Sequence, residues 1–479
     1  MRPTSNSAQR HAAAQTVAVR GEMAQAQADR RAARVGIRAT VTIALLALLA
    51  AMLGAVSAAC GPQLRDISID LAAASTSPRQ RLLIRTDQLL APVTEADVRI
   101  EPTAAAQVSV VDNTVVVEFS RALASGTEYR VSFAAVGERT GHTTEIKTSF
   151  TTPPAALTML RRDDKGFDTV VQAEIGADGA AEQTLLAAPR LQEYAVAATK
   201  VIAVSLDAAG RGTLVESTGA GGFQARADAP RAQRYRTLRG NLEGTALGFV
   251  ADGGNDDENG RLYLIDAETN ELFEVENLGG THSAVVEWSF VPGTRAVLVQ
   301  AANRQVTLVD PIGGRVPVPL GEYDTILGFF ADETSVLLQT ASEFTRINLR
   351  TGERTPIEVP DAVADPAASE GQLLPLTNDL YVRQFQTVDN AAGVQRTQLY
   401  RLSASDATLL AAPEDDWIGN VCRSPNAEFL ALLRVPDHPS IDSYPLQPGF
   451  IGSQLEIVRV DDGSSVATFD GLQANWCGW

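Results

Sequence analysis

The chain has 479 residues, of which 45% are hydrophobic, and it contains 37 glycines. This composition is typical of a folded, turn-rich protein and excludes a disordered chain, which has too few apolar residues to form a core. The formal net charge of −18 disfavours nucleic acid and anionic lipid headgroups as partners, because both bind basic surfaces.

The first predicted element is an export signal. Residues 41–56 contain no charged side chain, and seven arginines occur in the 40 residues before them. A basic segment followed by an apolar run and small residues is typical of a cleaved signal peptide. The alternative is an uncleaved membrane helix over residues 39–59, which would be about 30 Å long. The arginines keep the N-terminus inside in both cases, so we expect the rest of the chain outside the cytoplasm.

The end of the apolar run resembles the lipobox of bacterial lipoproteins. Residues 58–60, Ala-Ala-Cys, fit that motif, whereas Ser57 stands where leucine is usual. The resemblance implies a signal peptide over residues 1–59, a lipid on Cys60 and a tether over residues 60–63. It also implies that the protein is lipid-anchored to the bacterial cell membrane and faces away from the cytoplasm.

Removal of the signal would make the mature chain more acidic. Residues 1–59 hold seven basic and two acidic side chains, which leaves 33 basic and 56 acidic residues and a net charge near −23. Such a surface favours solubility and again disfavours nucleic acid. Met23 is an alternative start of translation, and it would leave a signal of more usual length.

Short alternating segments follow over residues 64–152. Every second side chain is apolar in Tyr129–Phe133, and the same alternation occurs in Val115–Phe119. A period of two predicts half-buried antiparallel strands. About seven such runs in roughly 90 residues predict a small β-sandwich.

Part of this region resembles the SbsA-type bacterial immunoglobulin-like (Ig-like) domain. The residues that carry the resemblance are Leu123, Gly126, Thr127 and Tyr129 in LASGTEYRV, followed by Gly141 and the closing Phe150-Thr151-Thr152. We expect Gly126 in a turn conformation that other residues adopt poorly, and Tyr129 with a buried ring whose hydroxyl reaches the backbone. The resemblance implies a spacer or adhesion module, without an active site, over residues 64–152.

Two prolines end this region, and residues 155–479 show short apolar strands separated by polar turns. Taking Phe249, Phe290 and Phe329 as equivalent gives spacings of 41 and 39 residues. A four-stranded propeller blade needs roughly 40 to 45 residues, and neighbouring blades bury the faces of each other's sheets. We therefore predict an all-β chain in which an Ig-like β-sandwich is followed by a β-propeller of about seven blades over residues 155–479.

Two recurring turns support the repeat. In the first, Asp266, Asp310, Asn348 and Asp461 are expected to accept hydrogen bonds from turn amides, and Asn270, Gly314, Gly352 and Gly463 to close the hairpin. The second is clearest in SPNAEFLAL, residues 424–432, which resembles the SPDGxxLA element of TolB-like and WD40-like propellers. This resemblance implies the fold and no particular subfamily.

The two ends of the predicted propeller complement each other. Residues 156–189 offer only three strands, and residues 474–479 align with the first strand of a blade, so we expect the last segment to enter the first sheet. Cys422 and Cys477 occupy equivalent positions one repeat apart. Such positions lie side by side around the axis, which predicts a disulfide; two separate buried thiols are the alternative.

The search for chemistry is mostly negative. The sequence lacks the GxSxG, HExxH, GxxxxGK[ST] and CxxC motifs, and no organic cofactor is predicted. Asp252, Asp256 and Glu258 lie on an acidic, glycine-rich loop and are candidate Ca²⁺ ligands. The alternative is a solvated hairpin loop.

The long insertion over residues 436–448 carries His438 and Tyr444, and we predict it as the first place for a partner contact. Two functions remain open. The first is a lipoprotein whose sandwich lifts the propeller off the membrane to bind a protein or a cell-envelope glycan. The alternative is an extracytoplasmic glycan lyase or hydrolase with its site on the propeller axis.

Overall fold

The computed structural model describes residues 42–49, 52, 61–163, 166–176, 182–198, 200–219, 221–253, 259–276, 284–331, 334–341, 343–360, 368–377, 379–389 and 394–478. Residues 42–49 and 52 are helical, and their large apolar side chains are exposed, with Ile43 at 67%. None of the helices in these ranges has both the length and the apolar character needed to cross a bilayer. Cys60, the predicted lipid site, lies outside the described residues, so the export signal stays a prediction.

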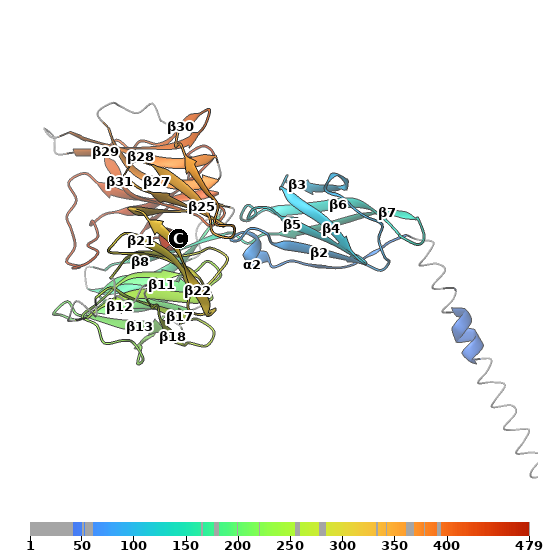
Figure 1. Cartoon of the computed structure of the whole chain (residues 1–479), viewed down its shortest axis with the longest axis horizontal. Helices are drawn as coiled ribbons and strands as arrows, with labels where there is room; N and C mark the ends of the chain where they lie inside the picture. Colours follow the sequence, from blue (N-terminus) through green and yellow to red (C-terminus); the bar gives the residue numbers. More distant parts are fainter. Residues whose placement is uncertain are drawn as a thin grey trace, which may run out of the picture.

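Residues 64–151 form two antiparallel sheets (Figure 1). One sheet has the order β1 (Leu64–Ser68), β2 (Arg81–Thr86), β5 (Thr114–Phe119) and β4 (Ala106–Val111), and the other has the order β3 (Val98–Glu101), β6 (Glu128–Val136) and β7 (Thr143–Thr151). The short helices α2 (Leu71–Ala74) and η1 (Glu95–Asp97) lie between strands. Side chains of both sheets, such as Val117 and Val131, meet in one buried cluster, so the sheets pack face to face.

Two residues of this unit have the predicted roles. Tyr129 is buried, stacks on Phe150 at 5.6 Å between ring centroids, and its hydroxyl accepts a hydrogen bond of 3.0 Å from the Ala124 amide. Gly126 has a φ of +61°, the left-handed conformation that favours glycine. These details are confirmed, whereas the Ig-like class of the unit stays a prediction.

The remaining described chain forms seven antiparallel sheets in chain order. The first has three strands, β8 (Ala155–Arg161), β9 (Phe167–Ile175) and β10 (Glu182–Pro189). The second sheet comprises β11 (Leu191–Ala197), β12 (Lys200–Leu206), β13 (Gly212–Ser217) and β14 (Phe223–Ala225). The third comprises β15 (Arg234–Gly240), β16 (Ala246–Asp252), β17 (Arg261–Asp266) and β18 (Leu272–Glu274). The fourth comprises β19 (Val285–Phe290), β20 (Val297–Ala301), β21 (Gln305–Asp310) and β22 (Arg315–Glu322). The fifth sheet comprises β23 (Thr325–Phe329), β24 (Ser335–Gln339), β25 (Phe344–Asn348) and β26 (Arg354–Ile357). The sixth comprises β27 (Ser369–Thr377), β28 (Leu380–Asp389), β29 (Val394–Ser403) and β30 (Ala407–Ala411). The seventh comprises β31 (Asp416–Arg423), β32 (Phe429–Pro436), β33 (Gln454–Arg459) and β34 (Ser465–Asp470).

This series of four-stranded sheets is the arrangement of β-propeller blades. The hydrophobic clusters lie between neighbouring sheets: one joins Leu264 of β17 to Trp288 of β19, and another joins Leu298 of β20 to Phe329 of β23. The first strands of successive sheets also contact one another, as β11 does with β15 and β27 with β31. The all-β class and the propeller are therefore confirmed, and each sheet buries its faces against its neighbours.

The predicted repeat is correct in most of its details. The side chains of Asp266, Asp310 and Asn348 accept hydrogen bonds from turn amides, and the four closing residues Asn270, Gly314, Gly352 and Gly463 all have a positive φ. In the fourth turn the acceptor is Asp462 and not Asp461, because the Ser464 amide donates to it. Phe249 was also wrongly aligned: it lies in the second strand of its sheet, whereas Phe290 and Phe329 end first strands.

The last described residues close the ring. Leu472 forms a bridge with Leu160 of β8 through two backbone hydrogen bonds of 2.7 and 2.9 Å. The chain therefore pairs with the first sheet beside β8, but at Leu472, just before the predicted segment 474–479. The predicted segment does not form a strand; it turns into the short helix η3 (Asn475–Gly478), which contacts β8, β15 and β31.

Side chains replace the missing strand pairing. The Asn475 Oδ1 atom accepts a hydrogen bond of 2.9 Å from the Thr158 amide, a position that a strand carbonyl would otherwise take. The Trp476 indole donates to the Ala156 carbonyl at 3.1 Å and its ring is stacked on Phe429. Backbone groups of β8 are thereby satisfied without a fourth regular strand.

Cys422 and Cys477 form the predicted disulfide. Their Cα atoms are 4.8 Å apart, and 55 residues separate them in the chain. Cys422 lies in β31 and Cys477 in η3, so the bond joins the last sheet to the segment that closes the first.

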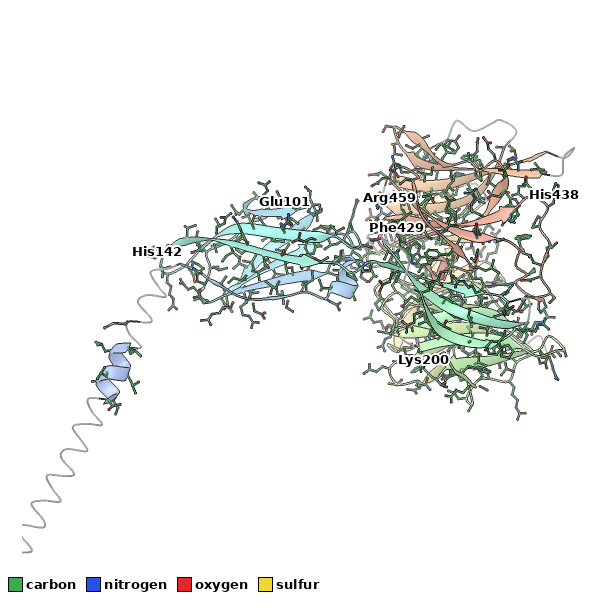
Figure 2. The ribbon with its side chains drawn as sticks, turned by 180° about the vertical axis from the view of Figure 1, so that it is seen from behind. Glu101, His142, Lys200, Phe429, His438 and Arg459 are labelled. Carbon is green, nitrogen blue, oxygen red and sulfur yellow. A yellow bond between two sulfur atoms is a disulfide. The ribbon has the colours of Figure 1, made fainter. Side chains whose placement is uncertain are left out.

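The first unit is attached to the propeller through the SPNAE turn between β31 and β32. The Glu428 carboxylate accepts a hydrogen bond of 2.8 Å from the Ser125 amide, and the Asn426 side-chain amide donates to the Leu123 carbonyl at 3.1 Å. At the other end of the unit, labelled by His142 in Figure 2, Gly61 packs against His142. The chain thus enters the unit at the end away from the propeller.

Loss of this joint is expected to free the two parts from each other. In the double variant Asn426→Ala/Glu428→Ala the hydrogen bonds to Leu123 and Ser125 are absent, so the orientation of the first unit is held less firmly. Small-angle X-ray scattering of the full chain in detergent should then show a broader range of shapes. Glu353→Ala, in an exposed turn of another sheet, is the control, and a scattering curve unchanged by the double variant would contradict the role of the turn.

Candidate binding site on the propeller axis

A β-bulge occurs in the first strand of each four-stranded propeller sheet. Pairing with the second strand shifts after Leu191, Arg236, Val285, Ile326, Glu370 and Ile418. Bulges re-aim side chains and are frequent beside functional sites. The residues at or just after these six bulges, Glu193, Arg239, Glu287, Leu327, Gln372 and Asn420, line the cavities at the centre of the ring.

Two cavities lie along the axis. The first, of about 270 Å³, is lined by β11, β15, the start of η3 and Gln447 of the long insertion. The second, of about 190 Å³, is lined mainly by β19, β23, β27 and β31. Both are lined by Arg239, Asn420 and Cys477, so they meet at η3.

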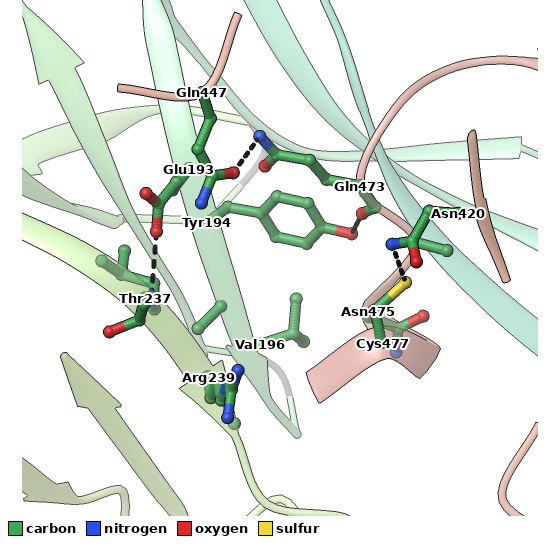
Figure 3. Close-up of a pocket in the computed structure, with 14 residues that line it drawn as sticks. Glu193, Tyr194, Val196, Thr237, Arg239, Asn420, Gln447, Gln473, Asn475 and Cys477 are labelled. Atoms are coloured by element: carbon green, nitrogen blue, oxygen red, sulfur yellow. Dashed lines mark hydrogen bonds between the residues drawn. The ribbon is translucent and has the colours of Figure 1, made fainter. Parts of the chain in front are cut away.

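Carboxamides are the most frequent polar side chains of the first cavity (Figure 3). They are Asn420, Gln447, Gln473 and Asn475. The Gln473 Nε2 atom donates to the Gln447 Oε1 atom and to the Gln192 carbonyl, both at 2.9 Å. These bonds hold the two glutamines in place while the carboxamides offer both donors and acceptors to a ligand.

Glu193 is the carboxyl group of this cavity. Its side chain is 3% exposed, one oxygen accepts a hydrogen bond of 3.0 Å from the Leu238 amide, and the other, Oε1, has no hydrogen-bond partner. Burial raises the pKa of Glu193 to about 7, although the Leu238 amide and the positive charges of Arg239 and Arg236 oppose the rise. The bulge thus places a buried carboxyl group of unusual pKa in the lining of the first cavity.

The positive charge that lines the first cavity, Arg239, is already balanced. The Arg239 guanidinium lies 2.6 Å from the Glu287 carboxylate and 5.6 Å from the centroid of the Trp288 ring. The Trp288 indole in turn donates to the Thr237 carbonyl at 3.2 Å. With Arg239 neutralised by Glu287, Glu193 determines the net charge of the first cavity.

Tyr194 also lines the first cavity but is a structural residue. Its hydroxyl lies 2.7 Å from the carbonyl oxygens of both Thr158 and Gln473. Burial raises its pKa well above the ordinary value, so it stays protonated. It joins β8, β11 and the closing segment rather than transferring protons.

The insertion after β32 contacts the first sheet and reaches the first cavity through Gln447. Tyr444 is its anchor: the ring lies 3.7 Å from the Arg162 guanidinium, and the hydroxyl donates to Asp168 at 2.5 Å. The prediction that Tyr444 contacts a partner is therefore corrected, because its side chain is 8% exposed and its hydroxyl is occupied. His438 is exposed near the edge of the propeller (Figure 2), and its predicted role stays a prediction.

Removal of the anchoring hydroxyl should loosen the insertion. Tyr444→Phe is expected to lower the free energy of unfolding by about 2 kcal/mol, because Asp168 is buried and loses a charged hydrogen bond. Urea denaturation measures this change. Tyr400→Phe, on a half-buried ring, should change stability by less than about 0.5 kcal/mol, and equal effects of the two variants would contradict the anchor.

The predicted calcium site has little support. Asp252 pairs with Arg236 at 2.9 Å and accepts a hydrogen bond from the Gly260 amide at 2.8 Å, so its carboxylate is occupied. Asp256 and Glu258 lie outside the described residues. Within the described ranges, no group of three or more His, Cys, Asp or Glu side chains is placed to hold a metal ion.

No family model and no curated protein sequence matches the chain. Among solved structures, the β-propeller domain of the Trilobed protease from Pyrococcus furiosus is 10% identical with a TM-score of 0.41, and the match covers 73% of this chain and 95% of that chain. The acylaminoacyl peptidase of Pyrococcus horikoshii is 11% identical with a TM-score of 0.39, over 71% of this chain and 50% of that chain. The dihydro-heme d1 dehydrogenase NirN is 12% identical with a TM-score of 0.39, over 66% and 74%. At this level of similarity the propeller assignment rests on the sheet order and packing described above.

The residues that line the axial cavities were not predicted from the sequence. Glu193, Arg239, Glu287 and Gln372 were not predicted as site residues, although each lies in the first strand of a sheet. The available signal is a polar residue that breaks the apolar pattern in each first strand, as Gln192-Glu193 does in LQEYAVA. A bulge is the structural cause of such a break.

Proposed function

We propose that the protein is a lipid-anchored, extracytoplasmic binding module for a cell-envelope glycan, and that the ligand occupies the first axial cavity. The observation that carries the proposal is the group of four carboxamides around the buried carboxyl of Glu193. Sugar hydroxyls both donate and accept hydrogen bonds, and carboxamides match them in both directions. The size of the cavity suits one sugar residue at the end of a chain better than a protein surface, which needs a much larger contact.

The first unit supports the membrane-anchored part of the proposal. We interpret it as an Ig-like spacer, because the chain enters it at one end and the SPNAE turn binds it at the other. A lipid on Cys60 would then hold the propeller one domain length away from the membrane. The exposed apolar side chains of residues 42–49 fit a segment that lies in a membrane before processing.

Hydrolysis or lyase chemistry is supported less well. The raised pKa of Glu193 suits a general acid. Glycosidases, however, generally use two carboxyl groups, and Glu287, the other carboxylate that lines the described axial cavities, is held by Arg239 at 2.6 Å. Binding does not require a second free carboxyl group, so it accounts for the site better than catalysis does.

The binding test uses the full chain in detergent and a panel of fluorescent cell-envelope glycan fragments. We expect saturable binding that weakens about tenfold in Gln447→Ala, because a hydrogen bond in a desolvated cavity is lost. Gln107→Ala, an exposed glutamine on β4, should bind as the wild type does. Absence of binding to the whole panel would refute the glycan, and release of shortened products would favour the enzyme.

The anchor is tested separately in cells. Cys60→Ser should remove the lipid-dependent mass increase, because acylation needs the thiol. Cys422→Ser keeps Cys60 and should keep the mass increase. A wild-type mass without this increase would support the uncleaved helix instead.

A further inference from the structure

The unpaired oxygen of Glu193 is the feature of the axial cavity that carries a further inference. Carboxylate oxygens buried in proteins are normally satisfied by hydrogen bonds or by a cation. The Leu238 amide donates to Glu193 Oε2 and the Thr237 amide also acts on the carboxyl group, whereas Oε1 is buried without a hydrogen-bond partner. Because Glu193 lines the cavity, a ligand can supply the missing donor.

The charges around Glu193 decide what kind of donor fits. Arg236 and Arg239 of β15 are the positive groups that act on it. Arg236 is paired with Asp252 at 2.9 Å and Arg239 with Glu287 at 2.6 Å. Each arginine thus has its own carboxylate, and ionised Glu193 is left as the surplus negative charge of the site.

We propose that the axial cavity selects sugars that carry a free, protonated amine, and that Glu193 Oε1 receives a hydrogen bond from this ammonium group. The proposal rests on the glycan-binding function above and names the class of sugar. The carboxamides of Asn420, Gln447 and Asn475, which line the same cavity, would bind the hydroxyl groups. An acetylated amine would lose the positive charge and add bulk, so amino sugars with a free amine are distinguished from N-acetylated ones.

The surroundings of Glu193 favour an ammonium group over a hydroxyl group as the donor to Oε1. A neutral hydroxyl would also reach Oε1, but it would leave the charge of Glu193 buried and uncompensated. A hydrogen bond from a charged donor is roughly twice as strong as one between neutral groups. The difference corresponds to about a tenfold preference for the amine.

The test compares D-glucosamine with D-glucose, because the two differ only in the amine at one position. Saturation-transfer NMR on the full chain in detergent at pH 7 should show about tenfold tighter binding of glucosamine. Glu193→Gln keeps the shape of the side chain and an acceptor for the Leu238 amide, and it should remove the preference, so that the two sugars bind equally. Glu353→Gln, on an exposed turn, is the control for charge and should keep the preference.

The outcomes separate the two proposals. Equal binding of both sugars by the wild type, or a preference that survives in Glu193→Gln, would overturn the selection of amines and leave glycan binding intact. Failure of both sugars and of every envelope glycan to bind would overturn the proposed function itself. A preference that also falls from pH 7 to pH 5 would support Glu193, since protonation removes its charge.

Discussion

Loss of the Cys422–Cys477 disulfide is expected to lower the free energy of unfolding of the propeller by about 4 kcal/mol. The bond closes a loop of 55 residues, and the loop-entropy model assigns about that much to a loop of this length. The bond also holds η3 on β31, so its loss should open the first sheet before the others. Urea denaturation of the double variant Cys422→Ser/Cys477→Ser measures the change.

A control variant and a direct test of the disulfide linkage complete this prediction. Cys60→Ser removes the remaining cysteine and should leave the unfolding free energy unchanged. Mass spectrometry of the unreduced protein should find the peptides of Cys422 and Cys477 linked. An unlinked pair, or a double variant as stable as the wild type, would contradict the structural role of the bond.

Replacement of Glu193 by glutamine is expected to stabilise the protein at alkaline pH. The pKa of Glu193 rises from 4.5 to about 7 on folding, chiefly through burial. The folded state therefore binds the proton more tightly, so the contribution of Glu193 to wild-type stability falls as pH rises from about 4.5 to 7 and stays low above it. The loss is about 3 kcal/mol in all, and Glu193→Gln avoids it because glutamine does not ionise.

The measurement is urea denaturation of both proteins at pH 4.5 and pH 8. The two should differ little at pH 4.5, and the variant should be the more stable at pH 8. Glu353→Gln, on an exposed turn, should show no such difference between the two pH values. A wild type whose stability relative to Glu193→Gln does not change with pH would contradict the buried, unpaired carboxyl.

The parts of the fold that depend on local pattern were predictable. Strand alternation and turn residues are local, and they predicted the all-β class, the hairpin turns and a propeller of about seven blades. The cysteine pair could also be predicted, because equivalent positions in a repeat become neighbours around an axis. Tyr129 was predictable because its ring and its backbone partner, Ala124, are close in the chain.

The axial site could not be predicted in the same way. Its residues come from β11, β15, β19, β27 and β31, and only closure of the ring brings them together. Each bulge shifts the alternation of inward and outward side chains, so in the sequence Glu193 appears as a polar residue within an apolar strand. The burial of Tyr444 was not predicted for a related reason: its partners Arg162 and Asp168 lie about 280 residues earlier in the chain, and nothing local indicates burial.

The position of the closing segment has a consequence for biosynthesis. Until Leu472 has emerged, the nascent polypeptide presents β8 as an unprotected border, since its partner is synthesised long after it. During synthesis this border would be open to chaperones, proteases and other nascent molecules. A premature stop before this residue would leave a permanently open ring, so quality control has a physical mark by which to remove truncated products.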